Sequence, residues 1–540
     1  MRIAMAVGTL AVATAVLLSG CTAEPGGTRA VITANGSEPQ NPLIPADTVE
    51  RGGARVVDSI FAGLVTYAAD GTVQNDAAES IEVNGDRTVF TVAVRTGLKF
   101  SDGTDVNATS FVKAWDWAAD SANGALDQAY FSDIKGYLAD DPATDDVERS
   151  SLLEAGGLVL VDESTFEIHL KAAGSDYPQR LGQRAYFPLP AVFYDDVDAF
   201  GEHPVGNGPY MLDGPDAWQH GKGIQLVTNP AYDGPRAPVN GGVSLIFYDD
   251  LDTAYVDVLA GFLDVLDDIP DSAMATREGE LGSRSIDQPG NSLLSITIPA
   301  TLPHFTGAEG VLRRSALSMA IDRDGINDRI FAGMRLPAVD FTSPVVEAYS
   351  DEVPGSEVLR YNDDEAKTRW AAADELSPWD GTFEIGYAAD SGERADVDAI
   401  AQSIALVLGI DAAGVPYPGA GDLNAAIAGK TIASAFVTER TAGYPGALTF
   451  LGPPYLTKAP ENVSGYASEG FEAAITAAAL AATTGDADSA FEDAQRILLA
   501  DLPAIPLWYS AWRAGYGDKV DHVELDWDAV PQYFQITKTP

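Results

Sequence analysis

The chain contains a single cysteine, Cys21, and this limits how the protein can be stabilised. No disulfide can form within the chain, and no thiolate metal site can be built from its body. A length of 540 residues exceeds what one hydrophobic core usually supports, and a hydrophobic content of 46% is typical of a well-packed protein. We therefore expect two or three domains that are held together by packing alone.

Cys21 also closes an unusual N-terminal segment. Arg2 is followed by an uncharged run from Ile3 to Leu18, which is shorter than the ~20 residues that a membrane-spanning helix needs. This pattern predicts a secretory signal peptide over residues 1–20. The motif Leu18-Ser19-Gly20-Cys21 resembles the bacterial lipobox, whose cysteine is acylated, for example with palmitate, and becomes the new N-terminus. An ordinary cleaved signal with an incidental cysteine is the alternative.

The lipobox resemblance implies a protein on the outer face of the cytoplasmic membrane. Cys21 would be the lipid-attachment site, and the polar residues 21–29 would form a tether. The formal net charge of the chain is −47, which makes nucleic acid and anionic lipid poor partners. Such a surface mildly favours cationic or zwitterionic ligands, or it serves only solubility.

The pattern of elements changes along the chain. The first half contains hairpin signals, such as Asn84-Gly85 between two alternating segments, and a helix over 106–119 with Phe111 and Trp115 on one side. The second half alternates helices with single strands, which indicates an α/β layer. The predicted helices span 310–321, 324–332, 363–375, 396–408, 469–483 and 487–500. A chain that leaves one domain, builds another and returns usually forms two lobes with a ligand cleft between them.

Signatures of catalysis are missing from the sequence. No Gly-x-Ser-x-Gly motif is present, and the five histidines are too scattered to form a histidine-pair zinc helix. Gly429-Lys430-Thr431 looks like the end of a phosphate-binding loop, but Asn424 stands where the first glycine is needed. Asp322 to Gly325 is better interpreted as a helix start than as a calcium loop. We expect a binding protein that is not an enzyme and that has no metal site and no cofactor.

Several segments together resemble one family, the oligopeptide and dipeptide substrate-binding lipoproteins of bacterial ABC importers (solute-binding protein family 5). The matches run in family order almost from end to end. They are Asn35 to Glu38, Gly97 to Ala108, Gly206 to Tyr210, Asn229 to Tyr232, and Leu312 to Arg323.

The resemblance implies an α/β fold, a two-lobed periplasmic-binding-protein-like flytrap of class II type with an extra N-terminal subdomain. Lobe I would comprise residues 30–66, 186–290 and 506–540, the extra subdomain 67–185, and lobe II 291–505. The protein would act as a monomer that captures di- or oligopeptides and delivers them to separately encoded permease and ATPase subunits. In this family a peptide lies extended between the lobes and pairs through its main chain.

One segment departs from the family pattern. Relatives carry an aspartate that holds the ammonium group of the peptide, whereas this chain has Gly443, and Arg440 replaces a tryptophan. A desolvated ammonium without a counter-charge costs about 3–5 kcal/mol. Glu38 or Glu439 could supply the carboxylate, or the ligand could be an N-blocked peptide or a non-peptide solute such as a metal chelate, haem, a sugar or an opine. Arg440 could instead meet an acidic group or form a surface ion pair only. The candidate ligand-binding residues are Glu38, Gln40, Tyr130, Glu439, Arg440, Thr441, Gly443 and Tyr444.

Overall fold

A computed structural model describes residues 29–138 and 149–539 of the chain. Its largest sheet has 12 strands and runs through the whole molecule. Its main path is β16 (Asp411–Tyr417), β15 (Thr382–Ala388), β17 (Ala435–Thr441), β13 (Ser285–Thr297), β18 (Ala504–Tyr516), β12 (Val265–Leu266), β1 (Val31–Gly36), β11 (Gly242–Phe247), β10 (Gly223–Thr228) and β8 (Tyr210–Leu212). Two short strands pair beside this path, β9 (Trp218–Gln219) with β10 and β14 (Leu336–Pro337) with β18.

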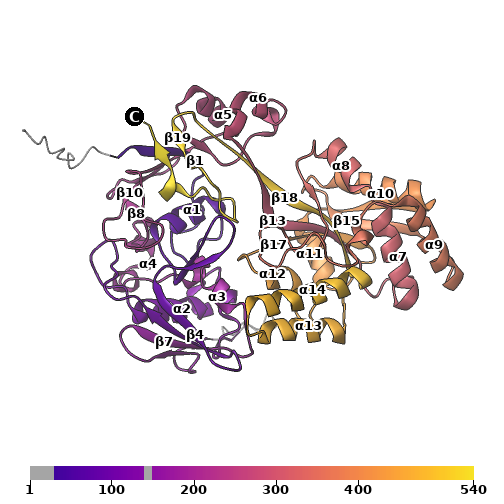
Figure 1. The fold of residues 1–540 in the computed structure, drawn as a ribbon, viewed down its shortest axis with the longest axis horizontal. Coiled ribbons are helices and arrows are strands. Elements are labelled where there is room, and N and C mark those ends of the chain that lie inside the picture. Colours follow the sequence, from indigo (N-terminus) through magenta and orange to yellow (C-terminus); the bar gives the residue numbers. More distant parts are fainter. Residues whose placement is uncertain (1–28, 139–148, 540) are drawn as a thin grey trace, which may run out of the picture.

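Figure 1 shows two lobes, and each lobe holds one of the two largest hydrophobic cores. The first core uses residues between Ile32 and Val265 and is completed by Val520, Val523, Tyr533 and Ile536 near the end of the chain. The second core uses residues between Leu294 and Trp508. The predicted two-lobed α/β fold is confirmed. The exact domain boundaries stay a prediction.

Two long strands join the lobes. β13 and β18 pair antiparallel from Ser285 opposite Gly515 to Thr297 opposite Ala504, with register shifts between Pro289 and Leu293 and between Leu294 and Ser295. Both strands cross from one half of the molecule to the other in Figure 1. The predicted boundaries at 290/291 and 505/506 thus fall inside continuous strands.

A separate sheet of four strands shares the core of the first lobe. Its order is β4 (Ala78–Val83), β5 (Val89–Val94), β7 (Thr165–His169) and β6 (Leu158–Leu160). The predicted hairpin around Asn84-Gly85 is confirmed, because β4 and β5 pair antiparallel. Helix α2 (Ala108–Ala119) begins with a capping box between Asn107 and Ser110 and buries Phe111 and Trp115, as predicted.

Helices cover the sheet of the second lobe. The predicted helices are confirmed as α7 (Gly307–Ala320), α8 (Arg323–Ile330), α9 (Asp363–Leu376), α10 (Arg394–Leu408), α13 (Glu469–Leu480) and α14 (Thr484–Asp501), and α11 (Ala420–Ala428) and α12 (Leu448–Leu451) join them. The first lobe carries α1 (Arg51–Ile60), α3 (Tyr177–Arg180), α4 (Val197–Glu202), α5 (Leu251–Ala260) and α6 (Arg277–Leu281). Within the described ranges, no helix combines the length and the apolar character that crossing a membrane requires.

Candidate functional site

A cavity of about 450 Å³ lies where the two lobes and the crossing strands meet. The first lobe contributes Arg51 at the start of α1 and Tyr130, the second lobe contributes the end of β17, and the crossing strands contribute Ser292 and Trp512. Ligand pockets of proteins usually measure about 300–1,000 Å³ and lie at domain interfaces. The place and the size of this cavity are therefore those of a ligand site.

Aromatic side chains form much of the apolar wall. Trp512 comes from β18, Trp527 from the loop that follows it, and Tyr130 from a short 3₁₀ helix after α2. The guanidinium group of Arg51 lies 4.4 Å from the ring centroid of Trp512 and 3.1 Å from the carboxylate of Asp267. Arg51 thus fixes the start of α1 against a crossing strand.

Five charged residues line the cavity: Arg51, Asp127, Arg184, Glu439 and Asp528. Arg184 pairs with Asp58 at 2.9 Å. Asn291 donates a hydrogen bond of 2.7 Å to Asp528, and Ser292 donates one of 2.6 Å to Glu439. Crowding by protein atoms raises the pKa of Asp127 to about 6, although the charge of Arg184 opposes this shift. The site is therefore polar and rich in carboxylates.

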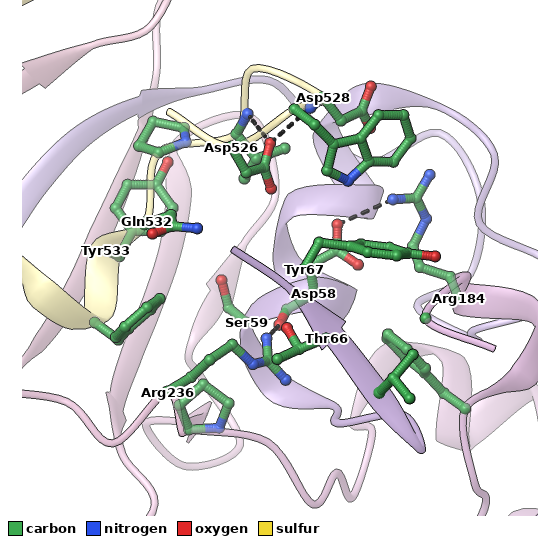
Figure 2. A pocket seen from close by; sticks show the side chains of 18 of the residues that line it. Asp58, Ser59, Thr66, Tyr67, Arg184, Arg236, Asp526, Asp528, Gln532 and Tyr533 are labelled. Carbon is green, nitrogen blue, oxygen red and sulfur yellow. Dashed lines mark hydrogen bonds and ion pairs between the residues drawn. The ribbon is translucent and has the colours of Figure 1, made fainter. Parts of the chain in front are cut away.

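A second, smaller cavity of about 90 Å³ shares Arg184, Trp527 and Asp528 with the first. Figure 2 shows Arg184 paired with Asp58, and Asp526 beside the backbone of Asp528. The carboxylate of Asp526 accepts hydrogen bonds of 2.9 Å from the N–H groups of Asp528 and Val530. Loss of water around Asp526, followed by the nearby charge of Asp528, raises the pKa of Asp526 to about 8.

Four of the predicted ligand-binding residues line the interlobe cavity together: Tyr130, Glu439, Thr441 and Gly443. Glu439 and Thr441 are exposed at the end of β17, on the same side of the strand. A Cβ atom at Gly443 would lie 2.4 Å from the hydroxyl of Tyr130. The tyrosine hydroxyl thus occupies the space that any side chain at position 443 would enter.

Glu38 and Gln40 lie outside the lining of this cavity. The carboxylate of Glu38 accepts hydrogen bonds from the indole N–H of Trp218 at 3.1 Å and from the N–H of Gly221 at 2.7 Å, and it lies 2.7 Å from Nδ1 of His220. Partial burial acts in the opposite direction, but these contacts lower the pKa of Glu38. Gln40 is exposed, and its backbone N–H donates to Glu50.

Arg440 and Tyr444 also lie outside the lining of the interlobe cavity. Arg440 faces a different cavity, of about 360 Å³, within the second lobe, where its Nε donates to the carbonyl of Thr449 and its Nη1 pairs with Glu461. Tyr444 is buried, and its hydroxyl donates a hydrogen bond of 2.5 Å to Asp176. Cys21 lies outside the described residues.

Sequence reasoning did not select Asp127, Arg184, Trp512 or Asp528 as site residues. These residues come from three distant parts of the chain, around Asp127, around Arg184, and from Trp512 to Asp528, and none of these parts carries a recognisable motif. Only the fold brings them to one cavity. Asp127 and Asp528 are also difficult to recognise because the chain has 80 Asp and Glu residues, so that no single carboxylate is distinctive in the sequence.

Two lobes, two crossing strands and a cavity between them define the flytrap class of solute-binding proteins. The model of the bacterial extracellular solute-binding proteins, family 5 (middle), matches residues 72–462, and the chain belongs to this family. This family consists of solute-binding proteins rather than enzymes.

Known relatives agree with this assignment. The chain is 27% identical over 327 residues to the periplasmic oligopeptide-binding protein OppA of Haemophilus influenzae, a match that covers 59% of this chain and 57% of the relative, less than two thirds of its length. It is 26% identical over 495 residues to the probable deoxycholate-binding periplasmic protein YgiS of Escherichia coli, covering 88% of this chain and 87% of the relative.

A solved structure shows the same fold. The unliganded open form of the periplasmic murein tripeptide-binding protein MppA superposes with a TM-score of 0.81 at 18% identity. The match covers 95% of this chain and 98% of that chain. The expected family and fold are confirmed.

Proposed function

We propose that this protein is the extracytoplasmic binding component of an ABC importer, which captures short peptides between its lobes and passes them to a separate permease and ATPase. The observation that carries this proposal is the cavity of about 450 Å³ lined by both lobes and by the crossing strands. The oligopeptide-binding and murein tripeptide-binding relatives support a peptide as the ligand.

Native mass spectrometry of the purified protein would test the proposal. We expect a co-purified mixture of short peptides, and we expect calorimetric titration of the stripped protein with defined peptides of two to five residues to show saturable binding. Replacement of Thr441 by a bulky residue, Thr441→Trp, would reduce this binding because Thr441 is exposed at the cavity wall. Absence of peptide both in the purified protein and in the titrations would contradict the proposal.

A non-peptide or N-blocked solute is the second candidate. In the family that this chain resembles, an aspartate that binds the ammonium group stands where this chain has Gly443. The hydroxyl of Tyr130 lies against this glycine. A relative that matches 88% of this chain is named for a bile acid rather than a peptide. The same mass spectrum would distinguish this candidate, because the bound molecule would lack amide-bond fragments.

We also propose that the protein acts as a monomer held at the outer face of the membrane through an acyl group on Cys21. Cys21→Ser would leave the folded domains unchanged and move the protein from the detergent phase to the aqueous phase in a Triton X-114 partition of cells. Ser19→Thr is the matched control, because it conserves the hydroxyl two residues before the cysteine. A Cys21→Ser variant that stays in the detergent phase would contradict the anchor.

A further inference from the structure

We propose that the interlobe cavity selects a solute that carries an ammonium or guanidinium group, and that Asp127 receives this cation. The inference rests on the proposed ligand-binding function and narrows its substrate class. It depends on how the charges around the cavity are paired.

The two cations of the cavity already have carboxylate partners. Arg51 pairs with Asp267 at 3.1 Å, and Arg184 pairs with Asp58 at 2.9 Å. Neither Asp267 nor Asp58 lines the interlobe cavity. Each arginine of the cavity thus has a carboxylate partner outside the cavity lining, although Asp267 also pairs with Arg55.

The three carboxylates of the cavity have no ion-pair partner at contact distance, although the charge of Arg184 acts on Asp127 and Asp528 from farther away. Within residues 29–138 and 149–539, no Lys, Arg or His lies within ion-pair distance of Asp127, Glu439 or Asp528. Glu439 and Asp528 each accept one hydrogen bond, from the neutral side chains of Ser292 and Asn291. The cavity consequently holds an excess of negative charge, and a cationic ligand would compensate it.

Asp127 is the carboxylate best placed to bind a ligand. Its backbone is fixed on both sides, because its N–H donates to the carbonyl of Ala46 and its carbonyl accepts from the N–H of Tyr130. Its carboxylate accepts no hydrogen bond from any residue in the part of the chain that the structure describes. A fixed, half-buried carboxylate that faces a cavity without a partner can take a charge-assisted hydrogen bond from a ligand.

Asp127 belongs to the first lobe, whereas β17 belongs to the second. Tyr130, one helical turn after Asp127, fills the space beside Gly443. The wall at Gly443 is therefore closed to a carboxylate while the wall at Asp127 offers one. The cation would bind at the first lobe instead of at the loop that follows β17.

Calorimetric titration of the full-length protein with four matched peptides tests the inference. The probes are C-terminal amides: Ala-Ala-Ala and Ala-Lys-Ala with free N-termini, N-acetyl-Ala-Ala-Ala, and N-acetyl-Ala-norleucine-Ala. We expect the cationic peptides to bind at least about tenfold more tightly than the neutral ones, and Asp127→Asn to remove this preference without changing the affinity for the neutral peptides. Asp216→Asn, which removes the same charge from an exposed loop outside the cavity, should keep the preference.

The outcomes separate the inference from the proposed function. Equal binding of cationic and neutral peptides, or a uniform loss of affinity in Asp127→Asn, overturns the inference and leaves peptide binding intact. If no peptide binds, the proposed function fails, and titration with spermidine and deoxycholate decides the inference. Spermidine binding that Asp127→Asn abolishes supports it, whereas binding of deoxycholate alone overturns it. Glu439→Gln, which keeps an acceptor for Ser292, repeats the test in the second lobe.

Discussion

Tyr130 and Gly443 are distant in the sequence but share one small volume in the cleft wall. A Cβ atom at position 443 would lie 2.4 Å from the Tyr130 hydroxyl oxygen and 3.4 Å from its Cζ atom. The glycine is therefore required by close approach and not by backbone conformation. The Tyr130 hydroxyl therefore fills the cavity wall at position 443, where the chain has no side chain.

Gly443→Asp is expected to lower the free energy of unfolding by about 1 kcal/mol, because the new side chain overpacks against Tyr130. Tyr130→Phe in the same chain should recover most of this loss, since it removes the clashing oxygen. Urea unfolding measures both effects. Gly485→Asp, at a glycine with open space around it, is the control. Equal stability of Gly443→Asp and the natural chain would contradict the close contact.

Asp526 gives the protein a pH dependence of known sign. Burial raises its pKa from 3.8 to about 8, so between these values the folded state binds more protons than the unfolded state. Stability should therefore fall as the pH rises from about 4 to about 8. Asp526→Asn keeps an oxygen for the N–H groups of Asp528 and Val530 and should flatten this fall.

Thermal unfolding between pH 5 and pH 9 measures the effect of Asp526. The melting temperature of Asp526→Asn should change less with pH than that of the natural chain, and Asp216→Asn should behave like the natural chain. A parallel pH profile for Asp526→Asn and the natural chain would show that Asp526 does not titrate in this range.

At the scale of elements, α3 connects the first lobe to the second. The Tyr444 hydroxyl donates to Asp176, the Arg180 guanidinium lies 5.4 Å from the Tyr444 ring centroid, and the Ser175 hydroxyl donates to the carbonyl of Ala478 in α13. Figure 1 shows α3 beside α13 on the far side of the cleft from the crossing strands. These contacts join the two lobes at a second place, in addition to the crossing strands.

Tyr444→Phe should weaken the contact between α3 and the second lobe, because removal of a buried hydroxyl from a charged acceptor costs about 1–3 kcal/mol. The open arrangement of the lobes should then become more populated. Small-angle X-ray scattering of the ligand-free protein should give a larger radius of gyration. Tyr417→Phe, at the end of β16, is the control. An unchanged radius for Tyr444→Phe would contradict a role of this contact in closure.

The sequence predicts most helices and several hairpins, but it does not predict the first crossing strand. Pro289 and Gly290 within β13 are typical of a break, and the pattern around them indicates a boundary. The strand continues because its register against β18 shifts between Pro289 and Leu293. Such a shift depends on the partner strand, more than 200 residues later in the chain, and no local pattern records it.

Some residues of the candidate site could likewise be predicted from the sequence, and others could not. Glu439, Thr441 and Gly443 could be predicted because they fall in one short segment that can be compared with a family. Asp127 and Asp528 could not, because each has meaning only when the fold brings it to the cavity. Arg440 was selected with its neighbours, but its guanidinium group binds the carbonyl of Thr449 and pairs with Glu461 at another cavity, which Glu439 also lines.

At the scale of the whole molecule, the net charge of −47 makes self-repulsion a general property of the fold. An increase in NaCl from about 10 mM to about 150 mM shortens the screening length from about 30 Å to about 8 Å. The melting temperature should rise over this range, and tetramethylammonium chloride should produce the same rise because screening depends on ionic strength. A melting temperature that falls with salt would indicate that attractive ion pairs dominate instead.

The core of the first lobe includes Val520, Val523, Tyr533 and Ile536, although the rest of that core comes from residues 32–265. Synthesis makes the N-terminal part of the chain first. The core of the first lobe therefore stays incomplete until residues 520–536 have been made. The second lobe, whose core ends at Trp508, can fold earlier. The half of the molecule that is made first is the half that is finished last.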